Sequence, residues 1–415
     1  MMRAARLRLG FLATVGAFSL TAAGAKQGSP SSRPVRVLLG SARTEVPLPA
    51  AGAWRLIDPA SRRVVASADT TRQWSLQREG RRVRAINADA PASPWVERSL
   101  VFELTSGAEV TWQQKAYRGA LMFVASDSAI LVVNRLDVED YLRGVLPLEI
   151  GARLTSDHAA VEAQAVAARS FTYTRMLASG TRDFDVRATE SDQVYGGTSV
   201  ETFWGDLAVA ATAGWVLSYR GQVVTGPYHS ACGGSTALPS DVWRGGQDGF
   251  LQSVDDTSPQ TGRPWCDLAP RAQWERRFSS TDLANAIARQ APAYTTVPAG
   301  AAQSIRDVRV EGRTTSNRAR ALVLSTAAGD VTVRANDIRY VLRSPGGELL
   351  PSTAMSVTTE RTATGQLQSL VVRGRGNGHG VGLCQWGAIA RARAGADFRA
   401  ILKAYYPGAE ITRAP

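Results

Sequence analysis

Glu149 is the residue of this sequence whose surroundings best suit acid–base chemistry. It lies between Leu148 and Ile150 and follows Pro147, which interrupts the helical spacing of the preceding apolar residues. A carboxyl group between large aliphatic side chains is poorly hydrated when ionised, so its pKa rises and it can hold a proton near neutral pH. The alternative is an ordinary solvated carboxylate in a turn.

Two predicted helices position this carboxyl group. Apolar residues at helical spacing predict a short helix over 139–146, and Glu149 follows in the turn. A long helix comes next, with Ser156 or Asp157 as its N-cap and Gly180 at its C-terminal end. The long helix is rich in alanine, so we expect neighbouring elements to approach it closely.

The stretches YLRGVLPLE and AVEAQAVAARSFTYTR, on either side of this turn, resemble the core signature of the SpoIID/LytB family. Further matches follow in the family's order: a QVY-G segment from Gln193, an HS–CGG–T turn from His229 and a glycine-rich loop around His379. The resemblance covers most of the chain after about residue 125. It implies a lytic transglycosylase that cleaves peptidoglycan glycan strands, with Glu149 as the catalytic acid.

A lytic transglycosylase needs one carboxyl group, whereas glycan hydrolysis usually needs two. The single group first protonates the glycosidic oxygen and then takes the proton of the attacking sugar hydroxyl. Glu149 has no obvious acidic partner at short range in the sequence, which suits the first chemistry. The alternative is a non-catalytic amidase enhancer or cell-wall-binding scaffold, with a cell-wall amidase as its partner. A role in sporulation is implied by the family name alone.

The resemblance also implies substrate-binding residues. We expect Gln193, Tyr195, His229 and His379 to line the glycan cleft. For His229 the alternative is a structural hydrogen bond, and for His379 it is a loop-bracing role. Arg169 shares a face of the predicted long helix with an acidic residue seven positions earlier, and it either contacts substrate or is a helix-surface charge.

The three cysteines are Cys232, Cys266 and Cys384. In an exported protein this odd number favours one disulfide, Cys232–Cys266, and one spare thiol. We expect no cofactor and no metal, but His229, Cys232 and Cys266 offer the ligand types of zinc. Some relatives in the family are thought to hold zinc with a histidine and cysteines. Cys384 stands where the family pattern often has serine, so the resemblance does not require it.

Composition and the first residues bear on location. The 415 residues carry a formal charge of +12, but the arginines are scattered rather than clustered. This pattern argues against nucleic acid and favours an anionic surface such as a cell wall. Three early arginines, an apolar stretch over 9–20 and an A-x-A site at 23–25 predict a signal peptide over 1–25. The mature chain, without a transmembrane segment, is then exported to the periplasm, cell wall or extracellular space.

The predicted fold class is α+β, because helices are followed by hairpins rather than alternating strictly with strands. Behind the signal peptide we expect a linker over 26–36 and a small all-β domain over 37–126. A SpoIID/LytB domain follows over 127–415, with a strand-rich insertion around 270–365.

Overall fold

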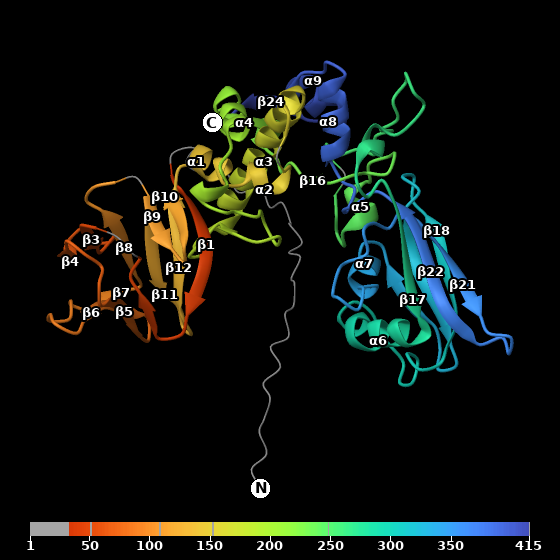
Figure 1. Ribbon diagram of the computed structural model, residues 1–415, viewed down its shortest axis with the longest axis horizontal. Helices are drawn as coiled ribbons and strands as arrows, with labels where there is room; N and C mark the ends of the chain where they lie inside the picture. The colour runs from red at the N-terminus through yellow and green to blue at the C-terminus, as the bar shows by residue number, and fades with distance from the viewer. Residues whose placement is uncertain (1–32, 50–51, 108, 152, 248, 415) are drawn as a thin grey trace, which may run out of the picture. The chain divides into compact units, whose positions relative to one another are not determined.

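The computed structural model describes residues 33–414 except 50–51, 108, 152 and 248 (Figure 1). The predicted signal peptide and most of the predicted linker lie outside the described residues. Helices and several sheets occur together, which confirms the α+β class, and the N-terminal part is rich in strands as predicted.

The chain forms two compact units. The first, here called the Glu149 unit, consists of Gln27–Tyr228 and Ala388–Pro415. The second, here called the cysteine unit, is the intervening segment His229–Gly387. This division differs from the predicted domain boundaries at 126 and around 270–365, which stay predictions.

A seven-stranded sheet begins the Glu149 unit. In its inner strands, either every second residue or several successive residues are apolar and buried. All neighbouring strands pair antiparallel except β1 and β13, which are parallel. In sheet order the strands are β13 (Val186–Arg187), β1 (Val35–Ala42), β12 (Ile130–Leu136), β11 (Ala120–Ala125), β8 (Ser99–Leu104), β3 (Trp54–Ile57) and β4 (Val64–Ala68).

Smaller sheets complete the strands of this unit. A four-stranded sheet contains β2 (Glu45–Pro47), β5 (Trp74–Glu79), β6 (Arg82–Asn87) and β7 (Val96–Glu97). A hairpin consists of β9 (Glu109–Trp112) and β10 (Lys115–Arg118). A three-stranded sheet has the order β15 (Gln222–Val223), β14 (Trp215–Tyr219) and β24 (Glu410–Arg413). Strand β24 therefore pairs with a strand that lies about 190 positions earlier in the sequence.

The helices of the Glu149 unit surround one long, buried helix. They are α1 (Val138–Arg143), α2 (Leu146–Glu149), α3 (His158–Ser179), α4 (Phe203–Ala211) and α9 (Phe398–Tyr405), while α8 (Gln385–Arg393) contains the boundary between the units. The long helix α3 packs against α4, α9 and β14 through its buried alanines. It ends at Gly180, as predicted, where φ is +53°.

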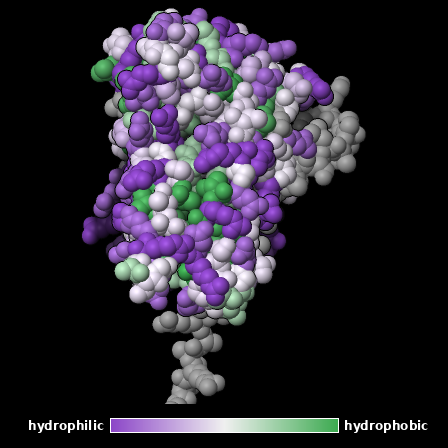
Figure 2. Space-filling model, turned by 90° about the vertical axis from the view of Figure 1, so that its right-hand side faces the viewer, coloured by the Kyte–Doolittle hydropathy of each residue, from purple (hydrophilic) through white to green (hydrophobic). Residues whose placement is uncertain are grey.

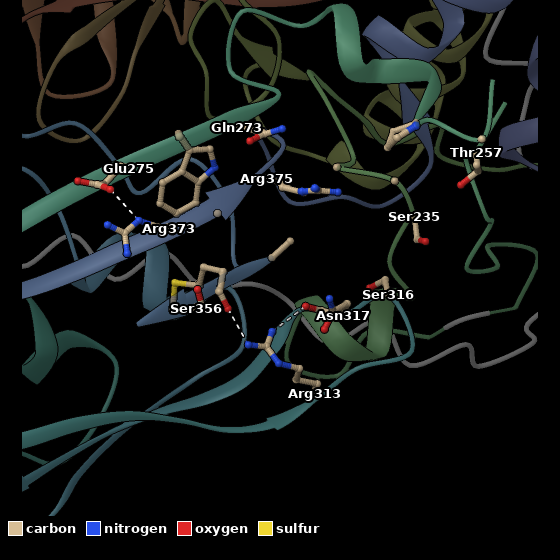
Figure 3. Close-up of a pocket in the computed structure, with 18 residues that line it drawn as sticks. Ser235, Thr257, Gln273, Glu275, Arg313, Ser316, Asn317, Ser356, Arg373 and Arg375 are labelled. Atoms are coloured by element: carbon tan, nitrogen blue, oxygen red, sulfur yellow. Dashed lines mark hydrogen bonds and ion pairs between the residues drawn. The ribbon is translucent and has the colours of Figure 1, made fainter. Parts of the chain in front are cut away.

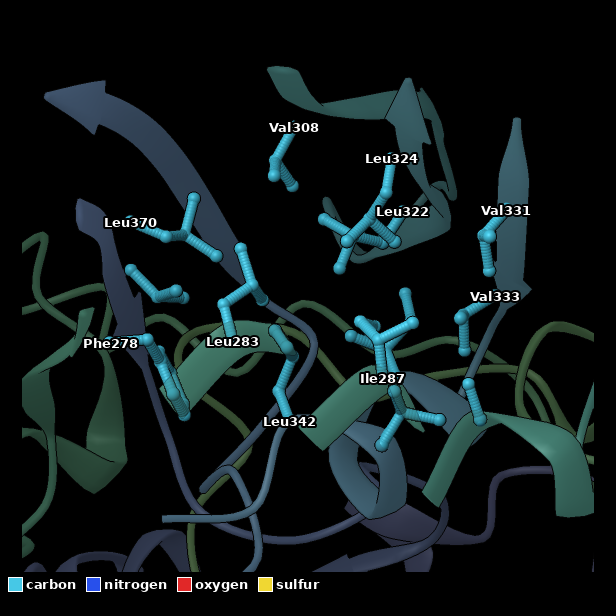
Figure 4. Close-up of a cluster of buried hydrophobic side chains, with 14 of the residues drawn as sticks. Phe278, Leu283, Ile287, Val308, Leu322, Leu324, Val331, Val333, Leu342 and Leu370 are labelled. Carbon is cyan, nitrogen blue, oxygen red and sulfur yellow. The ribbon is translucent and has the colours of Figure 1, made fainter. Parts of the chain in front are cut away.

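The cysteine unit contains two three-stranded sheets and a helix that share a core. The elements are α5 (Pro239–Val242), β17 (Gln273–Ser279), α6 (Ser280–Gln290), β18 (Ile305–Arg313), β19 (Ala319–Thr326), β20 (Val331–Arg334), α7 (Asp337–Val341), β21 (Met355–Arg361) and β22 (Leu367–Arg375). Figure 4 shows Leu283 and Ile287 of α6 facing apolar side chains of both sheets. Because α6 carries its apolar residues four positions apart, one of its faces is buried throughout. The short strand β16 (Tyr228–His229) pairs with β23 (Leu383–Cys384).

The exposed side of the β17–β22–β21 sheet carries charged cross-strand pairs. Glu275 lies opposite Arg373 in the register and accepts a hydrogen bond of 2.7 Å from its Nε. Arg277 pairs with Glu360. Figure 2 shows a face on which hydrophilic side chains predominate around a small hydrophobic group. Within the part of the chain that the structure describes, no helix combines the length and the apolarity needed to cross a membrane.

Candidate functional site

Glu149 is the last residue of the four-residue helix α2. The prediction that Pro147 leaves Glu149 in a turn is therefore corrected: Pro147 lies in the first turn of a new helix, where its missing N–H is no loss. Leu146 is fully buried and Ile150 is 2% exposed, so they anchor the helix on both sides of a half-buried Glu149.

Two hydrogen-bond donors hold the Glu149 carboxylate. The backbone N–H of Val194 donates to Oε1 at 2.8 Å, and the hydroxyl of Tyr228 donates to the same carboxyl group. Burial raises the pKa of Glu149, the two hydrogen bonds lower it, and the negative charge of Glu190 raises it. The net effect is a raised pKa, which is the first of the two alternatives that the apolar neighbours of Glu149 left open.

Gln193 orients the Tyr228 hydroxyl group through a hydrogen bond. Its side chain is fully buried, and Oε1 accepts hydrogen bonds from Thr172 (2.9 Å) and Tyr141 (3.3 Å). Because Oε1 is the acceptor, Nε2 is the donor, and it donates to the Tyr228 hydroxyl oxygen at 3.2 Å. The Tyr228 proton is thereby directed toward Glu149. Gln193 is thus brought to the site, but it lies behind Tyr228 and is not exposed to a substrate in this conformation.

Tyr195 fixes the segment that supplies the Val194 N–H. Its hydroxyl donates to Asn134 Oδ1 of β12 at 3.0 Å, and its ring packs against that of Tyr141 with centroids 5.0 Å apart. A Cβ on Gly144 would come within 2.5 Å of the Tyr195 ring, so the chain after α1 needs glycine at this position. Tyr195 is 4% exposed, which gives it a supporting position rather than direct access to a ligand.

Arg169 is buried in the Glu149 unit rather than displayed on the surface of α3. Its guanidinium donates to both carboxylate oxygens of Glu139, at 2.8 and 2.6 Å, and to the Trp215 carbonyl oxygen at 3.0 Å. The side chain is 0% exposed. These contacts join α1, α3 and β14, and they leave no surface for the predicted substrate contact in this conformation.

His229 and His379 belong to the cysteine unit, whereas Glu149 belongs to the other unit. His229 Nδ1 lies 3.1 Å from the Val381 carbonyl oxygen, and His379 Nδ1 accepts the Val381 N–H at 3.0 Å. Burial lowers the pKa of His229 well below its ordinary value, so the ring is neutral and Nδ1–H donates. The bracing role is therefore present in the structure, and glycan contact stays a prediction.

The three cysteines converge in the cysteine unit. Cys232 Sγ lies 3.6 Å from Cys266 Sγ, and all three thiols are buried and unlinked. The Asp256 carboxylate accepts a hydrogen bond from Cys232 Sγ at 3.2 Å. Interactions with the Cys232 and Cys384 side chains and hydrogen bonds from backbone N–H groups lower the pKa of Cys266 to about 3. The sequence drew attention to Cys232 and Cys266, but it missed Asp256 and set Cys384 aside.

A polar cavity of about 1000 Å³ opens in the cysteine unit, and Gly233 and Gly234, which follow Cys232, are part of its lining (Figure 3). Arg313 is held there by the carbonyl oxygens of Asn317 and Met355, and Arg373 by Glu275. The other labelled side chains are Ser235, Thr257, Gln273, Ser316, Ser356 and Arg375. None of the predicted catalytic or substrate-binding residues lines this cavity.

The fold and the site define an α+β protein with a desolvated, hydrogen-bonded carboxyl group suited to acid–base chemistry. A family described as stage II sporulation protein, SpoIID, matches residues 126–219, and a domain of unknown function matches 267–382. An uncharacterized protein of Brachyspira hyodysenteriae is 32% identical over 75% of this chain and 76% of its own length. The chain belongs to the SpoIID/LytB family, whose members are related to the cell wall.

Two named relatives come from Bacillus subtilis. The amidase enhancer is 31% identical over 65% of this chain, but the match spans only 40% of that protein's length. Stage II sporulation protein D is 26% identical over 72% of this chain and 83% of its own length. The chain therefore corresponds in extent more closely to stage II sporulation protein D than to the amidase enhancer.

Replacing Glu149 with glutamine should change stability in a pH-dependent way. Because the folded-state pKa is raised, ionisation costs the folded state stability once the pH exceeds the ordinary glutamate range. We expect E149Q to match the wild type in acid and to be more stable at neutral pH, by about 1.4 kcal/mol per unit of pKa elevation. Urea unfolding at the two pH values measures the difference. The Glu97→Gln variant is the control, because Glu97 is exposed on β7 of the same unit, and an equal pH effect in both variants would contradict the assignment.

Breaking the buried ion pair should destabilise the Glu149 unit. Glu139→Gln leaves the Arg169 guanidinium buried without a counter-charge, and we expect a loss of about 3 kcal/mol in the free energy of unfolding. Glu103→Gln removes the exposed pair with Arg55 and should cost less than about 1 kcal/mol. Comparable losses in the two variants would show that Arg169 does not depend on Glu139.

Proposed function

We propose that this protein is an exported peptidoglycan lytic transglycosylase that cleaves glycan strands in cell-wall remodelling, with Glu149 as its single acid and base. The observation that carries the proposal is the half-buried Glu149 carboxyl group, whose pKa is raised by burial while two donors fix its orientation. Membership of the SpoIID/LytB family supports the choice of substrate.

In the first step, protonated Glu149 donates its proton to the oxygen of the glycosidic bond, and the bond to the anomeric carbon breaks. Burial makes this possible, because it keeps a fraction of the carboxyl group protonated near neutral pH. The exposed side chain of Leu148 beside it provides an apolar surface on which a sugar ring can rest.

In the second step, the Glu149 carboxylate takes the proton of the sugar's own 6-hydroxyl group as that oxygen attacks the anomeric carbon. A 1,6-anhydro sugar forms, and Glu149 is again protonated. The Val194 N–H and the Tyr228 hydroxyl stabilise the carboxylate between the steps. Burial raises the pKa of Glu149, whereas the two hydrogen bonds lower it. The carboxyl group can therefore give up a proton in the first step and take one in the second.

The surrounding residues have supporting roles in this proposal. Gln193 directs the Tyr228 proton, and Tyr195 positions the segment that carries the Val194 N–H. Arg169 fixes the helices below the site through Glu139. Contact of His229 and His379 with the glycan remains part of the proposal, in addition to their contacts with Val381.

The remaining parts of the proposal concern location and partners. The predicted signal peptide and the family's relation to the cell wall support export to the periplasm, cell wall or extracellular space. A second function, enhancement of a cell-wall amidase without catalysis, is favoured by the similarity to a protein named amidase enhancer. In that case the amidase is the direct partner and Glu149 has no chemical role.

A digest of intact and peptide-stripped peptidoglycan by the purified chain tests the catalytic proposal. We expect fragments with 1,6-anhydro termini, and E149Q should reduce their rate by at least about a hundredfold, because the general acid is lost. Mass spectrometry of the products measures both. E97Q is the matched control, since it removes an exposed carboxylate on β7 that is not among the groups acting on Glu149, and it should keep most of the activity.

Other products of this digest would contradict the proposal in distinct ways. Equal activity of E149Q and the wild type would remove Glu149 from catalysis. An absence of fragments from the wild-type chain, together with faster digestion when an amidase is added, would establish the enhancer function instead.

Tyr228→Phe should shift the pH profile of this digest. The Tyr228 hydrogen bond lowers the pKa of Glu149, so its loss raises that pKa and keeps the acid protonated to higher pH. We therefore expect the alkaline limb of the activity profile to move to higher pH, with a lower maximal rate. An unchanged profile would show that Tyr228 does not contact the reacting carboxyl group.

A further inference from the structure

Four potential metal ligands of the cysteine unit meet in one buried cluster. The Sγ atoms of Cys232, Cys266 and Cys384 and a carboxylate oxygen of Asp256 all lie within 4.8 Å of one another. Each of the four residues is at most 1% exposed. They come from separate parts of the chain, because Cys232 and Cys384 are 152 positions apart.

The distances between these atoms suit a bound metal. A tetrahedral zinc ion with bonds of about 2.3 Å to sulfur separates two sulfur ligands by roughly 3.8 Å, and a sulfur and an oxygen ligand by roughly 3.5 Å. The observed separations are 3.6 Å between Cys232 Sγ and Cys266 Sγ and 3.2 Å between Cys232 Sγ and Asp256 Oδ2. These two separations are close to those of a tetrahedral coordination shell, and the other four lie within 4.8 Å.

Backbone N–H groups point at all three sulfur atoms. Cys232 Sγ accepts from Gly234 (3.3 Å), and Cys266 Sγ accepts from Gly233 (3.3 Å). Cys384 Sγ accepts from the N–H groups of Cys232 (3.2 Å) and Gly387 (3.4 Å). Such donors stabilise thiolates, and second-shell hydrogen bonds of this kind orient and tune metal ligands. With φ of +82° and +119°, Gly233 and Gly234 adopt the backbone conformation that turns both N–H groups inward.

The charge around the cluster is also appropriate. Three thiolates and one carboxylate carry four negative charges, so a divalent ion leaves two uncompensated. Arg318 is 1% exposed, and its Nη2 donates to the Cys232 carbonyl oxygen at 2.9 Å. Its Nε and Nη1 have no hydrogen-bond partner among the described residues. A buried guanidinium beside the cluster compensates part of the remaining negative charge.

His229 does not belong to this set. The resemblance to the family suggested a zinc site formed by His229, Cys232 and Cys266, but His229 is not among the four residues whose ligand atoms converge. Its Nδ1 is instead engaged with the Val381 carbonyl oxygen. The observed set has four protein ligands and leaves no open position, which is typical of structural rather than catalytic zinc.

We propose that Cys232, Cys266, Cys384 and Asp256 bind one zinc ion in a closed structural site that connects the turn after β16, the segment from Asp256 to Cys266 and strand β23. The three cysteines bind as thiolates, so binding releases those thiol protons that are still present. The site stabilises the cysteine unit and takes no part in glycan chemistry. The zinc site is therefore independent of the proposed catalytic function.

Metal and thiol analysis of the purified full-length chain tests the proposal. We expect about one zinc per chain by elemental mass spectrometry, with other metals well below that level. Alkylation of the denatured, chelator-treated chain should then modify all three cysteines. An absence of zinc, with Cys232 and Cys266 joined by a disulfide and a single reactive thiol, would overturn the proposal. A different stoichiometric metal would overturn the identity of the ion.

Variants separate the proposed ligand set from the one that the resemblance suggested. Cys384→Ser and Asp256→Ala should lose most of the zinc, whereas His229→Gln should retain it. Loss of zinc in H229Q with retention in C384S would overturn the assignment.

Cobalt substitution of the unmutated chain gives a second readout that does not depend on folding of the variants. Thiolate-to-cobalt charge-transfer bands and the intense visible bands of tetrahedral cobalt are expected. The weak bands of octahedral cobalt would contradict a closed site.

Discussion

The desolvation of one carboxyl group is the constraint on which the Glu149 unit depends. A glutamate at the end of a four-residue helix would be an ordinary surface acid if Leu146 and Ile150 did not anchor it against the core. Burial alone would leave it neutral and inert as a base. The Val194 N–H and the Tyr228 hydroxyl lower the pKa that burial raises, and so they keep the ionised form accessible. Gln193 and the β12 residue Asn134 belong to this arrangement because they orient the two donors.

Much of the Glu149 site could be predicted from the sequence. The apolar neighbours of Glu149 indicated a raised pKa as one of two alternatives, and the predicted long alanine-rich helix and its glycine terminus were correct. The α+β class followed from the pattern of helices and hairpins. The position of Pro147 was misjudged, because proline stops a helix from within but is accepted in the first turn of the next one.

Contacts between distant segments could not be predicted. Tyr228 reaches Glu149 across 79 positions, and nothing in its own strand signals this contact. Asp256 lies in a loop with an ordinary polar composition, so only the folded chain shows it beside Cys232. Arg169 reads as a surface charge on a helix, yet its partner Glu139 is 30 positions away and draws it into the interior. In each case periodicity describes one element, whereas the pairing depends on how elements pack.

The most direct test of the central claim is the origin of the oxygen in the products when the purified chain digests peptidoglycan in water enriched in oxygen-18. If the Glu149 carboxyl group acts alone and the sugar's own hydroxyl attacks, the new termini contain no oxygen-18 and have the anhydro mass. Incorporation of one labelled oxygen per cleavage would mean that water attacks. It would require a second carboxyl group, for which Glu190 is the first candidate, and would contradict a single-acid mechanism.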